Sequence, residues 1–381
     1  MKVIDTERIP IKMWLDDIED NALNQAKNLA NLGFAYKWIA IMPDSHSGYG
    51  VPIGGVMATT NGIIVPNAVG KDIGCGMIAV RTSLKDIDVE TIKQIMGKIR
   101  EVVPVGFNHQ DTKQEWAGYT EAPDVPIIQQ QLEASTKQLG TLGGGNHFIE
   151  IQKGDDGYIW LMIHSGSRNF GLQVANVYHK KAQGLCEKWL SDIPDKDLAF
   201  LPIDTKEGKE YYDAMNFCLK FAQENRYLMM SRVSAIVYET TEAVTTGVIN
   251  IHHNYAAFEN HYGQNVLIHR KGATKVTLGL DGIIPGSMGT NSYIVKGKGN
   301  EESFQSCSHG AGRKMGRKEA TRTLNLADEQ KKMEGIVHGL RTERELDEAP
   351  GSYKDIDAVM DNQKDLVEPV VKLKPLGVIK G

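Results

Sequence analysis

The sequence predicts an α+β fold in one compact domain, residues 1–381, with a β-rich core and flanking helices. Strand-like segments lie on both sides of a mainly helical block at about residues 174–242. The chain contains no internal repeat, no low-complexity tract and no obvious linker. Its 41% hydrophobic and 24% charged residues are typical of a globular protein. Segregated rather than alternating helices and strands favour the α+β class.

The first third of the chain is predicted to contain one helix followed by short strands. Residues 17–32 carry apolar residues at helical spacing. Residues 36–42 form an apolar run, predicted to be a strand, that ends in the glycine-rich segment 43–50. Residues 51–82 combine glycines with β-branched residues, which predicts short strands and tight turns. Residues 108–135 are polar and contain two prolines, so we expect a loop or insertion there.

In the remaining two thirds, predicted strands lie on both sides of the helical block. Residues 148–152 and 158–163 are predicted strands, and the helical block is expected to break near Pro194 and Pro202. Strands are expected again at 247–252 and within 265–295. The last fifth is polar and is predicted to be helical, closing with the segment 376–381.

Charge and cysteine content exclude several classes of protein. The net charge of −5, from 43 basic and 48 acidic residues, gives no overall attraction to nucleic acid, so such binding needs a local patch. The four cysteines form no C-x-x-C pair, which argues against a disulfide framework and a zinc ribbon. The N-terminal segment lacks the apolar stretch of a signal peptide, and no run of about 18 apolar residues occurs. We therefore expect a cytoplasmic protein without a membrane partner.

The segment 307–313 carries the most informative pattern of the chain. His309 lies among small residues, beside glycines that would let a phosphate approach the backbone. Five basic residues follow at spacings that place them on one side of a helix: Arg313, Lys314, Arg317, Lys318 and Arg322. A glycine-rich loop entering a helix is an anion site, and a histidine there can attack phosphorus or bind a metal. A small-residue turn before a solvated basic helix fits these residues equally well.

Side chains that bind metals recur where predicted strands end. They are Asp72 and Cys75 in a glycine-rich turn, His147 after three glycines, His164 after an apolar run, and the pair His252 and His253. One aspartate, one cysteine and three of these four histidines could hold one metal ion, or two if the thiolate bridges. Each residue alone is more often structural than a ligand. Ligand softness favours zinc. No Walker A motif and no G-x-S-x-G motif occurs.

Taken together, these motifs resemble the RtcB family of RNA ligases. The resemblance covers almost the whole chain in order, and its segments are MPDSHSGYGVPIGG (42–55), VGKDIGCGM (69–77), GTLGGGNHFIE (140–150), HSGSRNFG (164–171), HHNYA (252–256), HRKGAT (269–274), IPGSMGTNSYIV (284–295), GNEESFQSCSHGAGR (299–313) and SYKDIDAVM (352–360). It implies a central pocket for metal and nucleotide. It also implies a GTP- and manganese-dependent ligase that joins RNA with a 2′,3′-cyclic phosphate or 3′-phosphate to RNA with a 5′-hydroxyl.

The resemblance also implies roles for single residues. His309 would carry GMP, and two manganese ions would be bound by Asp72, Cys75, His147, His164 and His253, with Cys75 bridging. Tyr353 would stack on guanine and Lys380 would bind its edge. The implied GTP contacts are Asn146, Glu150, Asn254, Ser287, Ser292, His309, Gly310, Ala311, Gly312, Tyr353 and Lys380, and an RNA patch would comprise Arg313, Lys314, Arg317 and Lys318. Asp44 and His46 lie in a family motif near the pocket. Some relatives use an archease-type activator.

Three positions depart from the family pattern without removing a ligand: Ser45, Lys71 and Gly144. Ser45 and Lys71 stand where apolar residues are expected. The family's manganese also disagrees with the zinc that ligand softness favours, and we follow the family because metal availability and geometry often override softness. Two alternatives to the ligase are a metal-dependent phosphoesterase that processes RNA ends without joining them, and a non-catalytic RNA-binding protein that uses the patch.

Overall fold

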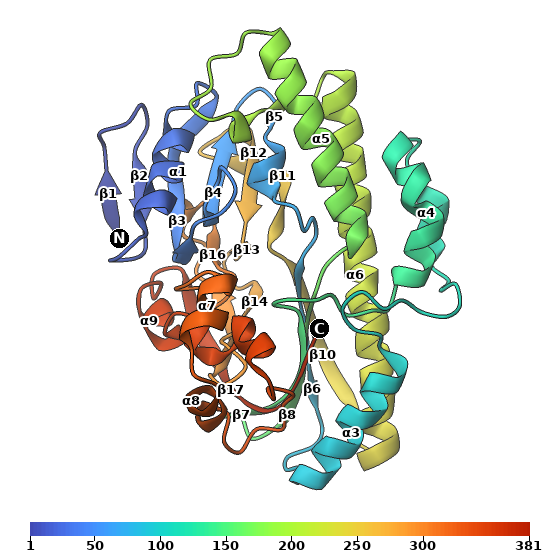
Figure 1. Cartoon of the computed structure of the whole chain (residues 1–381). Coiled ribbons are helices and arrows are strands. Elements are labelled where there is room, and N and C mark those ends of the chain that lie inside the picture. The colour runs from blue at the N-terminus through green and yellow to red at the C-terminus, as the bar shows by residue number, and fades with distance from the viewer.

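Two large sheets form the frame of the molecule, and the computed structural model describes all 381 residues (Figure 1). The six-stranded sheet has the order β1 (Lys2–Ile4), β2 (Ile11–Met13), β3 (Ala35–His46), β4 (Ile53–Thr59), β12 (Gln264–Lys271) and β11 (Asn254–His261). The seven-stranded sheet has the order β10 (Thr245–His252), β6 (Gly76–Thr82), β8 (Ile159–Ser165), β7 (Phe148–Gly154), β17 (Val367–Lys380), β15 (Ser292–Gly297) and β14 (Asp281–Ile284). Two small pairs complete the strands, β13 (Ala273–Lys275) with β16 (Ser306–Ser308) and β5 (Ile63–Ile64) with β9 (Leu201–Pro202).

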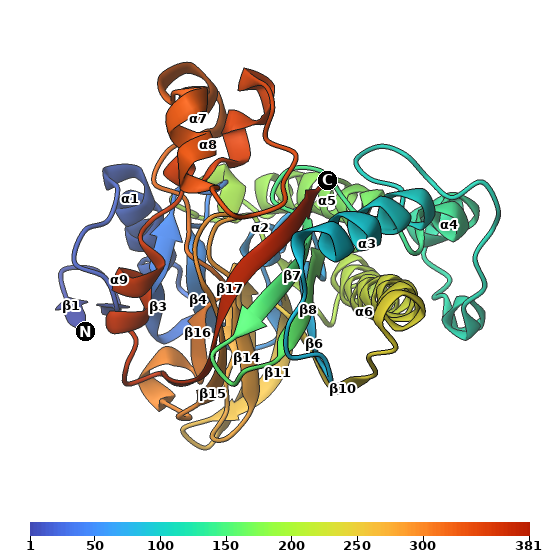
Figure 2. The ribbon, with the colours of Figure 1, turned by 90° about the horizontal axis from the view of Figure 1, so that it is seen from below.

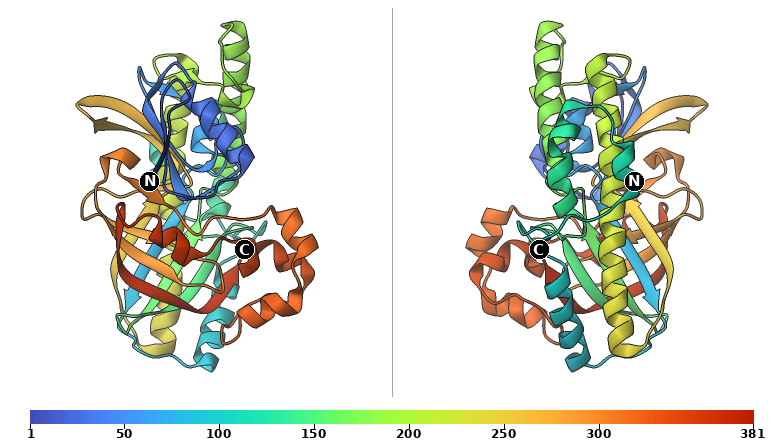
Figure 3. Two further views of the ribbon diagram at one scale, coloured as in Figure 1. Left: turned by 90° about the vertical axis from the view of Figure 1, so that its left-hand side faces the viewer. Right: turned by 90° about the vertical axis from the view of Figure 1, so that its right-hand side faces the viewer.

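The helices lie on opposite sides of this frame. Figure 1 shows α5 (Asn169–Lys188) and α6 (Lys206–Thr241) along one side, with α4 (Pro126–Gln138) outside them and α3 (Val89–Val102) below. In Figure 2, α3, α4 and α6 gather on one side of the seven-stranded sheet. Figure 3 shows the C-terminal helices projecting from another side. The remaining helices are α1 (Asp20–Ala30), α2 (Pro66–Val69), α7 (Arg317–Thr323), α8 (Leu326–Lys332) and α9 (Ile356–Asp361), with 3₁₀ turns η1 (Ala117–Glu121), η2 (Lys196–Leu198), η3 (Glu301–Ser303), η4 (Glu343–Glu348) and η5 (Pro350–Ser352).

The two faces of the seven-stranded sheet pack against different parts of the molecule, because side chains alternate between the faces along each strand. Leu161 and Ile163 of β8 belong to a buried apolar cluster with residues of α3 and α6. Met162, between them, packs in a second cluster with Phe148 of β7 and strands β14, β15 and β17. Successive side chains of a strand point to opposite faces, so His164 points to the face of Met162, away from the helices. Burying each large apolar side chain stabilises this arrangement by about 1.5–3 kcal/mol.

Strand pairing brings the chemically interesting side chains to one end of the seven-stranded sheet. His164 pairs with Met77 of β6 on one side and with Phe148 of β7 on the other. His252 of β10 pairs with Gly76 of β6, and Lys380 of β17 pairs with Phe148. The residues just before Gly76 and Phe148 and just after His252 are Cys75, His147 and His253. The register alone therefore places all of them near the same strand ends.

The α+β class and the split helical block are confirmed. The helical block consists of α5 and α6, and the break between them contains both prolines that were expected to interrupt it. None of the helices is both long and apolar enough to cross a membrane.

The predicted loop at 108–135 is wrong from residue 117 onward, where the chain forms η1 and α4. Pro126 is the first residue of α4, where its missing N–H costs no helical hydrogen bond, so this proline starts a helix rather than breaking one.

The predicted helical C-terminus is wrong at its end. The chain closes with β17, a 14-residue strand in the interior of the seven-stranded sheet between β7 and β15. Pro369 and Pro375 obscured this strand in the sequence, because proline is expected at sheet edges. Both prolines sit at or beside register shifts of the ladder, where fewer hydrogen bonds are needed.

Candidate active site

The five predicted metal ligands converge at the strand ends. Cys75 Sγ lies 3.3 Å from Nε2 of His147 and 3.2 Å from Nε2 of His164. Nε2 of His164 lies 3.4 Å from Nε2 of His253, and Nε2 of His147 lies 3.1 Å from a carboxylate oxygen of Asp72. The cysteine and the three histidines are buried. Cys75, His147 and His164 by themselves form a group that can hold a metal ion.

The protonation states of this cluster fit a metal site. Burial lowers the pKa of His164 and of His253 well below the usual range, so both rings are neutral, the form that binds metals. His164 Nδ1 lies 3.2 Å from the carbonyl of Asn146, which leaves Nε2 free for the cluster. Burial, together with the neighbouring Asp72 carboxylate, raises the pKa of Cys75 well above its usual range. A thiolate at this position therefore requires a cation beside it.

Contacts within the cluster have the spacing expected of ligands that share an ion. Ligands bound at about 2.0–2.3 Å to one tetrahedral ion lie roughly 3.3–3.8 Å from each other. The contacts of Cys75 with the histidines and of His164 with His253, 3.2–3.4 Å, lie at or just below the lower end of that range. The donor set therefore fits a metal ion.

Arg226 of α6 supports the cluster from behind and was missed in the sequence. Its guanidinium donates to the carbonyls of Gly74 and Ser165, at 2.9 and 3.0 Å, and to the side chain of Asn250 at 2.8 Å. It thereby ties together the ends of β8 and β10 and the turn before β6. Arg226 is fully buried, and the only signal in the sequence was a charged residue on the apolar side of a long helix.

His309 lies beside the cluster and is oriented by Asp44. Its Nδ1 is 2.6 Å from Oδ2 of Asp44, and its backbone N–H donates to the same oxygen at 3.1 Å. The ring centroid lies 4.8 Å from that of His253. Because Asp44 is an acceptor, the proton sits on Nδ1 and the lone pair of Nε2 is free to react. Asp44 is fully buried, which strengthens this contact.

Two glycines are required for this close approach. Gly312 has φ +73°, and a Cβ there would lie 2.0 Å from the carbonyl oxygen of Asp44. Gly272 has φ +63°, and a Cβ there would lie 3.1 Å from the ring of His309. Both positions have the left-handed conformation that favours glycine, and a side chain at either one would push Asp44 or His309 away.

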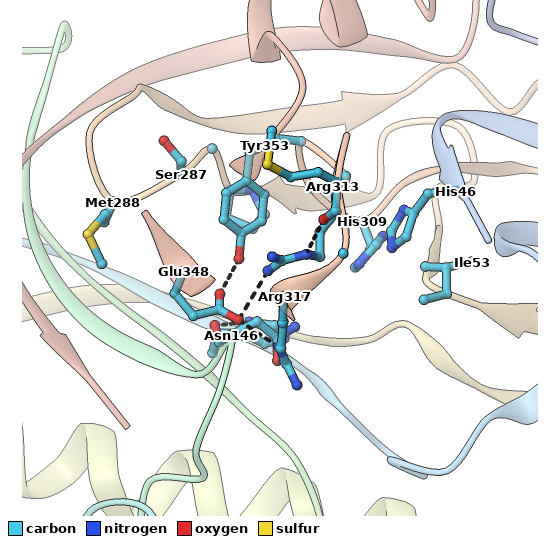
Figure 4. A pocket seen from close by; sticks show the side chains of 18 of the residues that line it. His46, Ile53, Asn146, Ser287, Met288, His309, Arg313, Arg317, Glu348 and Tyr353 are labelled. Carbon is cyan, nitrogen blue, oxygen red and sulfur yellow. Dashed lines mark hydrogen bonds and ion pairs between the residues drawn. The ribbon is translucent and has the colours of Figure 1, made fainter. Parts of the chain in front are cut away.

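A cavity of about 560 Å³ extends from both sides of His309 (Figure 4). In Figure 4, His46 and Ile53 lie on the His309 side, and Ser287 and Met288 lie at the opposite end. The lining includes most of the implied GTP contacts, namely Asn146, Glu150, Ser287, His309, Gly310, Ala311, Gly312, Tyr353 and Lys380. The other two, Ser292 and Asn254, are not among the lining residues. Ser292 accepts a hydrogen bond from the N–H of Gly286, and Asn254 links the carbonyl of Asp72 to the N–H of Gly272.

Glu348 contacts several cationic side chains and a tyrosine at the end of the cavity away from His46. This residue was not identified from the sequence. Its carboxylate accepts a hydrogen bond from the Tyr353 hydroxyl and lies 3.5 Å from Lys380 Nζ. Arg313 and Arg317 contact its other oxygen at 3.2 and 3.0 Å (Figure 4). Burial opposes ionisation, but Lys380, the tyrosine hydroxyl and the arginines lower the pKa of Glu348 below its usual value. The group is therefore an ionised, buried carboxylate.

Comparison with known proteins agrees with this geometry. The family model described as tRNA-splicing ligase RtcB matches residues 25–123 and 112–381. The chain belongs to the RtcB family. The RNA-splicing ligase RtcB of Escherichia coli K12 is 39% identical over 407 residues, covering 100% of this chain and 99% of that protein. The tRNA-splicing ligases RtcB of Pyrobaculum aerophilum and Thermococcus kodakarensis are 32% and 31% identical, each over 98% of this chain and 95% of their own length.

The basic segment of this RtcB chain is not the single helical face that its spacing predicted. Helix α7 begins only at Arg317, and the segment before it is held by hydrogen bonds of Ala311 to Pro285 and of Lys314 to Ser352. Arg313 and Arg317 both turn toward Glu348, whereas Lys314 and Lys318 are exposed. The helix therefore does not start at the glycines beside His309.

Ser45 and Lys71, which stand where apolar residues were expected, have different environments. Ser45 is fully buried and its hydroxyl has no partner. Lys71 is exposed, and its Nζ lies 4.1 Å from the ring centroid of Tyr49. Of these two side chains, only that of Lys71 makes a cation–π contact with a residue that lines the cavity, Tyr49.

Proposed function

We propose that this RtcB protein is a GTP- and manganese-dependent RNA ligase that works through a GMP intermediate on His309. As a member of its family the chain is an RNA ligase. It would join a 3′-phosphate or 2′,3′-cyclic phosphate end to a 5′-hydroxyl end in tRNA splicing or RNA repair. The observation that carries the proposal is His309, which Asp44 orients inside a large cavity and beside a buried cysteine–histidine cluster.

In the first step His309 acts as the nucleophile. Asp44 holds the proton on Nδ1, so Nε2 attacks the α-phosphorus of GTP while the bond to pyrophosphate breaks. An imidazole that carries a proton on Nδ1 and a phosphorus on Nε2 is positively charged. The buried Asp44 carboxylate offsets this charge at 2.6 Å. Asp44 would therefore favour formation of the phosphoramidate as well as orient the ring.

The same contact serves the second step, the transfer of GMP from His309 to the RNA end. A cyclic end is first opened by water to the 3′-phosphate. An oxygen of that phosphate then attacks the phosphorus on His309, and the P–N bond breaks. His309 leaves as a neutral imidazole because Nδ1 already holds its proton. The 5′-hydroxyl finally attacks the activated 3′-phosphate and expels GMP, which completes the new phosphodiester.

We assign the binding of two manganese ions to Asp72, Cys75, His147, His164 and His253. When bound, the ions supply positive charge that stabilises the charge developing on phosphate oxygens. The neutral imidazoles and the buried thiol described above support this assignment. Arg226 would keep the strand ends that carry these side chains in place.

We assign the guanine to the end of the cavity lined by Ser287, Tyr353 and Lys380. Tyr353 offers a ring for stacking and Lys380 an ammonium for the base edge, and Glu348 holds both. Glu150 lies on the neighbouring strand β7, buried, with Gln152 donating to it at 2.6 Å. Its carboxyl would accept the N–H groups of guanine, which distinguish guanine from adenine.

The test is intact-protein mass spectrometry after incubation with GTP and manganese. We expect a covalent GMP adduct in the wild type and in His109→Ala, an exposed histidine outside the cavity, and none in His309→Ala. An adduct that persists in His309→Ala would refute the assignment of His309 as the nucleophile. Folded, manganese-loaded wild type that forms no adduct but hydrolyses cyclic phosphate ends would instead be a phosphoesterase of RNA ends.

A further inference from the structure

The loop between β3 and β4 displays an exposed tyrosine at the end of the cavity opposite the proposed guanine end. Tyr49 is 64% exposed and lines the same cavity as His309. Its loop runs from His46 to Ile53, two residues that Figure 4 places on the His309 side, away from Ser287 and Met288. Tyr49 therefore borders the part of the cavity that GTP would leave open to a second substrate.

The backbone of this loop is fixed by buried side chains. Lys271 Nζ donates to the carbonyls of Tyr49 and Val51 at 3.1 and 2.8 Å, and Lys271 is only 7% exposed. Gln25 donates to the carbonyl of Gly48 at 2.6 Å and accepts from its N–H at 3.1 Å. An exposed aromatic ring on a fixed backbone is preorganised for contact, because little conformational entropy is lost on binding.

A cation accompanies the ring. Lys71 Nζ lies 4.1 Å from the ring centroid of Tyr49, within the range of a cation–π contact. A ring of this kind stacks with any nucleobase, and an adjacent ammonium attracts the sugar–phosphate backbone. Lys71 and Tyr49 come from different segments of the chain, before β6 and after β3, so their contact is produced by the fold.

We propose that Tyr49 and Lys71 form a stacking platform for the terminal nucleotide of a single-stranded RNA end beside His309. The proposal rests on the ligase function proposed above and adds the subsite that receives the RNA. The platform acts on the affinity for RNA, whereas GTP binds at the other end of the cavity. Lys71 supplies positive charge beside the ring, so this chain would hold RNA ends more tightly at low salt.

The test measures the KM for RNA and the rate of GMP adduct formation separately, in variants of Tyr49 and in a matched control. Tyr49→Ala is expected to raise the KM for RNA about tenfold, the loss of one stacked base, while the rate of GMP adduct formation is unaffected. Tyr49→Phe keeps the ring and should restore most of the RNA affinity. Tyr262→Ala is the matched control, because Tyr262 is 43% exposed with Lys37 Nζ 4.5 Å from its ring but lies in the β11–β12 turn outside the cavity.

Lys71→Met tests the charge, because it keeps the apolar stem of the side chain. It should weaken RNA binding by a few-fold and reduce the salt dependence by about 0.7 log units per log of salt. An unchanged KM for RNA in Tyr49→Ala, or equal losses in Tyr49→Ala and Tyr262→Ala, would overturn the platform.

The test remains informative if the proposed ligase function fails. Fluorescence anisotropy with single-stranded RNA oligonucleotides that carry a 3′-phosphate or a 5′-hydroxyl needs no GMP adduct. Weaker binding of either strand by Tyr49→Ala supports the platform even in a protein that forms no adduct. Unchanged binding of both strands contradicts it, whatever the adduct experiment shows.

Discussion

The two halves of the active site are held together by different means. The cysteine–histidine cluster sits on the paired ends of β6, β7, β8 and β10, and the sheet register fixes its ligand atoms 3.2–3.4 Å apart. The guanine end is built from the irregular segments that carry Arg313, Glu348 and Tyr353 and from the end of β17, and one carboxylate connects them. Backbone pairing therefore positions the first half, and charge balance positions the second.

This difference predicts how each half responds to substitution. The strand ends stay in place when one ligand is removed, so such a change should abolish metal binding while the fold persists. Removing the carboxylate of Glu348 leaves Arg313 and Lys380 facing each other without a counter-charge. That change should loosen the segments themselves and affect stability and nucleotide binding together.

Cys75→Ala should produce the largest effect on the first half. We expect the affinity for manganese to fall by more than about 100-fold, because the loss of a direct ligand exceeds the 10–100-fold cost of losing a supporting residue. Cys186→Ala, which removes a buried free cysteine that is not part of the cluster, should bind manganese like the wild type. The measurement is a manganese titration followed by electron paramagnetic resonance, with circular dichroism as the check of folding. Equal manganese affinity in both variants would contradict the ligand assignment.

Glu348→Gln should have an intermediate effect on the second half. The amide keeps the shape of the side chain but removes the charge, so we expect the KM for GTP to rise about tenfold. The free energy of unfolding should fall by about 2 kcal/mol, less than for a fully buried ion pair because Arg317 is half exposed and screened by solvent. Glu343→Gln, an exposed glutamate of the same η4 turn, is the control for both quantities. A loss of GTP affinity with unchanged thermal stability would show that Glu348 contacts the nucleotide rather than positions its neighbours.

The contrast between the halves also explains what the sequence could reveal. The metal-type residues were recognisable because each lies beside a predicted strand or in a glycine-rich turn, and antiparallel pairing then brought Cys75, His147, His164 and His253 together. Glu348 lies in a run of acidic residues that looks like a solvated surface. Its role depends on tertiary contacts with Arg313 and Lys380 that no local pattern encodes.

In the basic segment, the local pattern predicted a structure that tertiary contacts prevent. Arg313 and Arg317 have helical spacing, yet Ala311 and Lys314 use their backbone N–H groups for tertiary hydrogen bonds to Pro285 and Ser352. These bonds delay the start of α7 until Arg317. A local propensity was overridden here by long-range contacts, just as Pro369 and Pro375 did not prevent β17 from entering the sheet.

Glu150 joins the two halves, because it lies on β7 yet lines the guanine end, and we expect it to make GTP binding depend on pH. Burial raises the pKa of Glu150 to about 8, although Lys380 and Gln152 oppose the rise. The folded protein therefore holds this proton between about pH 4.5 and 8 while the unfolded chain releases it, so the contribution of Glu150 to the free energy of unfolding decreases as pH rises through that window. If the ionised carboxylate accepts the guanine N–H groups, GTP affinity should rise with pH up to about 8, by at most about tenfold per unit. Calorimetric titration with GTP between about pH 6 and 9 should show this slope in the wild type and a flat, weaker profile in Glu150→Gln. The same slope in both proteins would show that another group titrates. It would contradict the prediction that the charge of Glu150 contributes to guanine recognition.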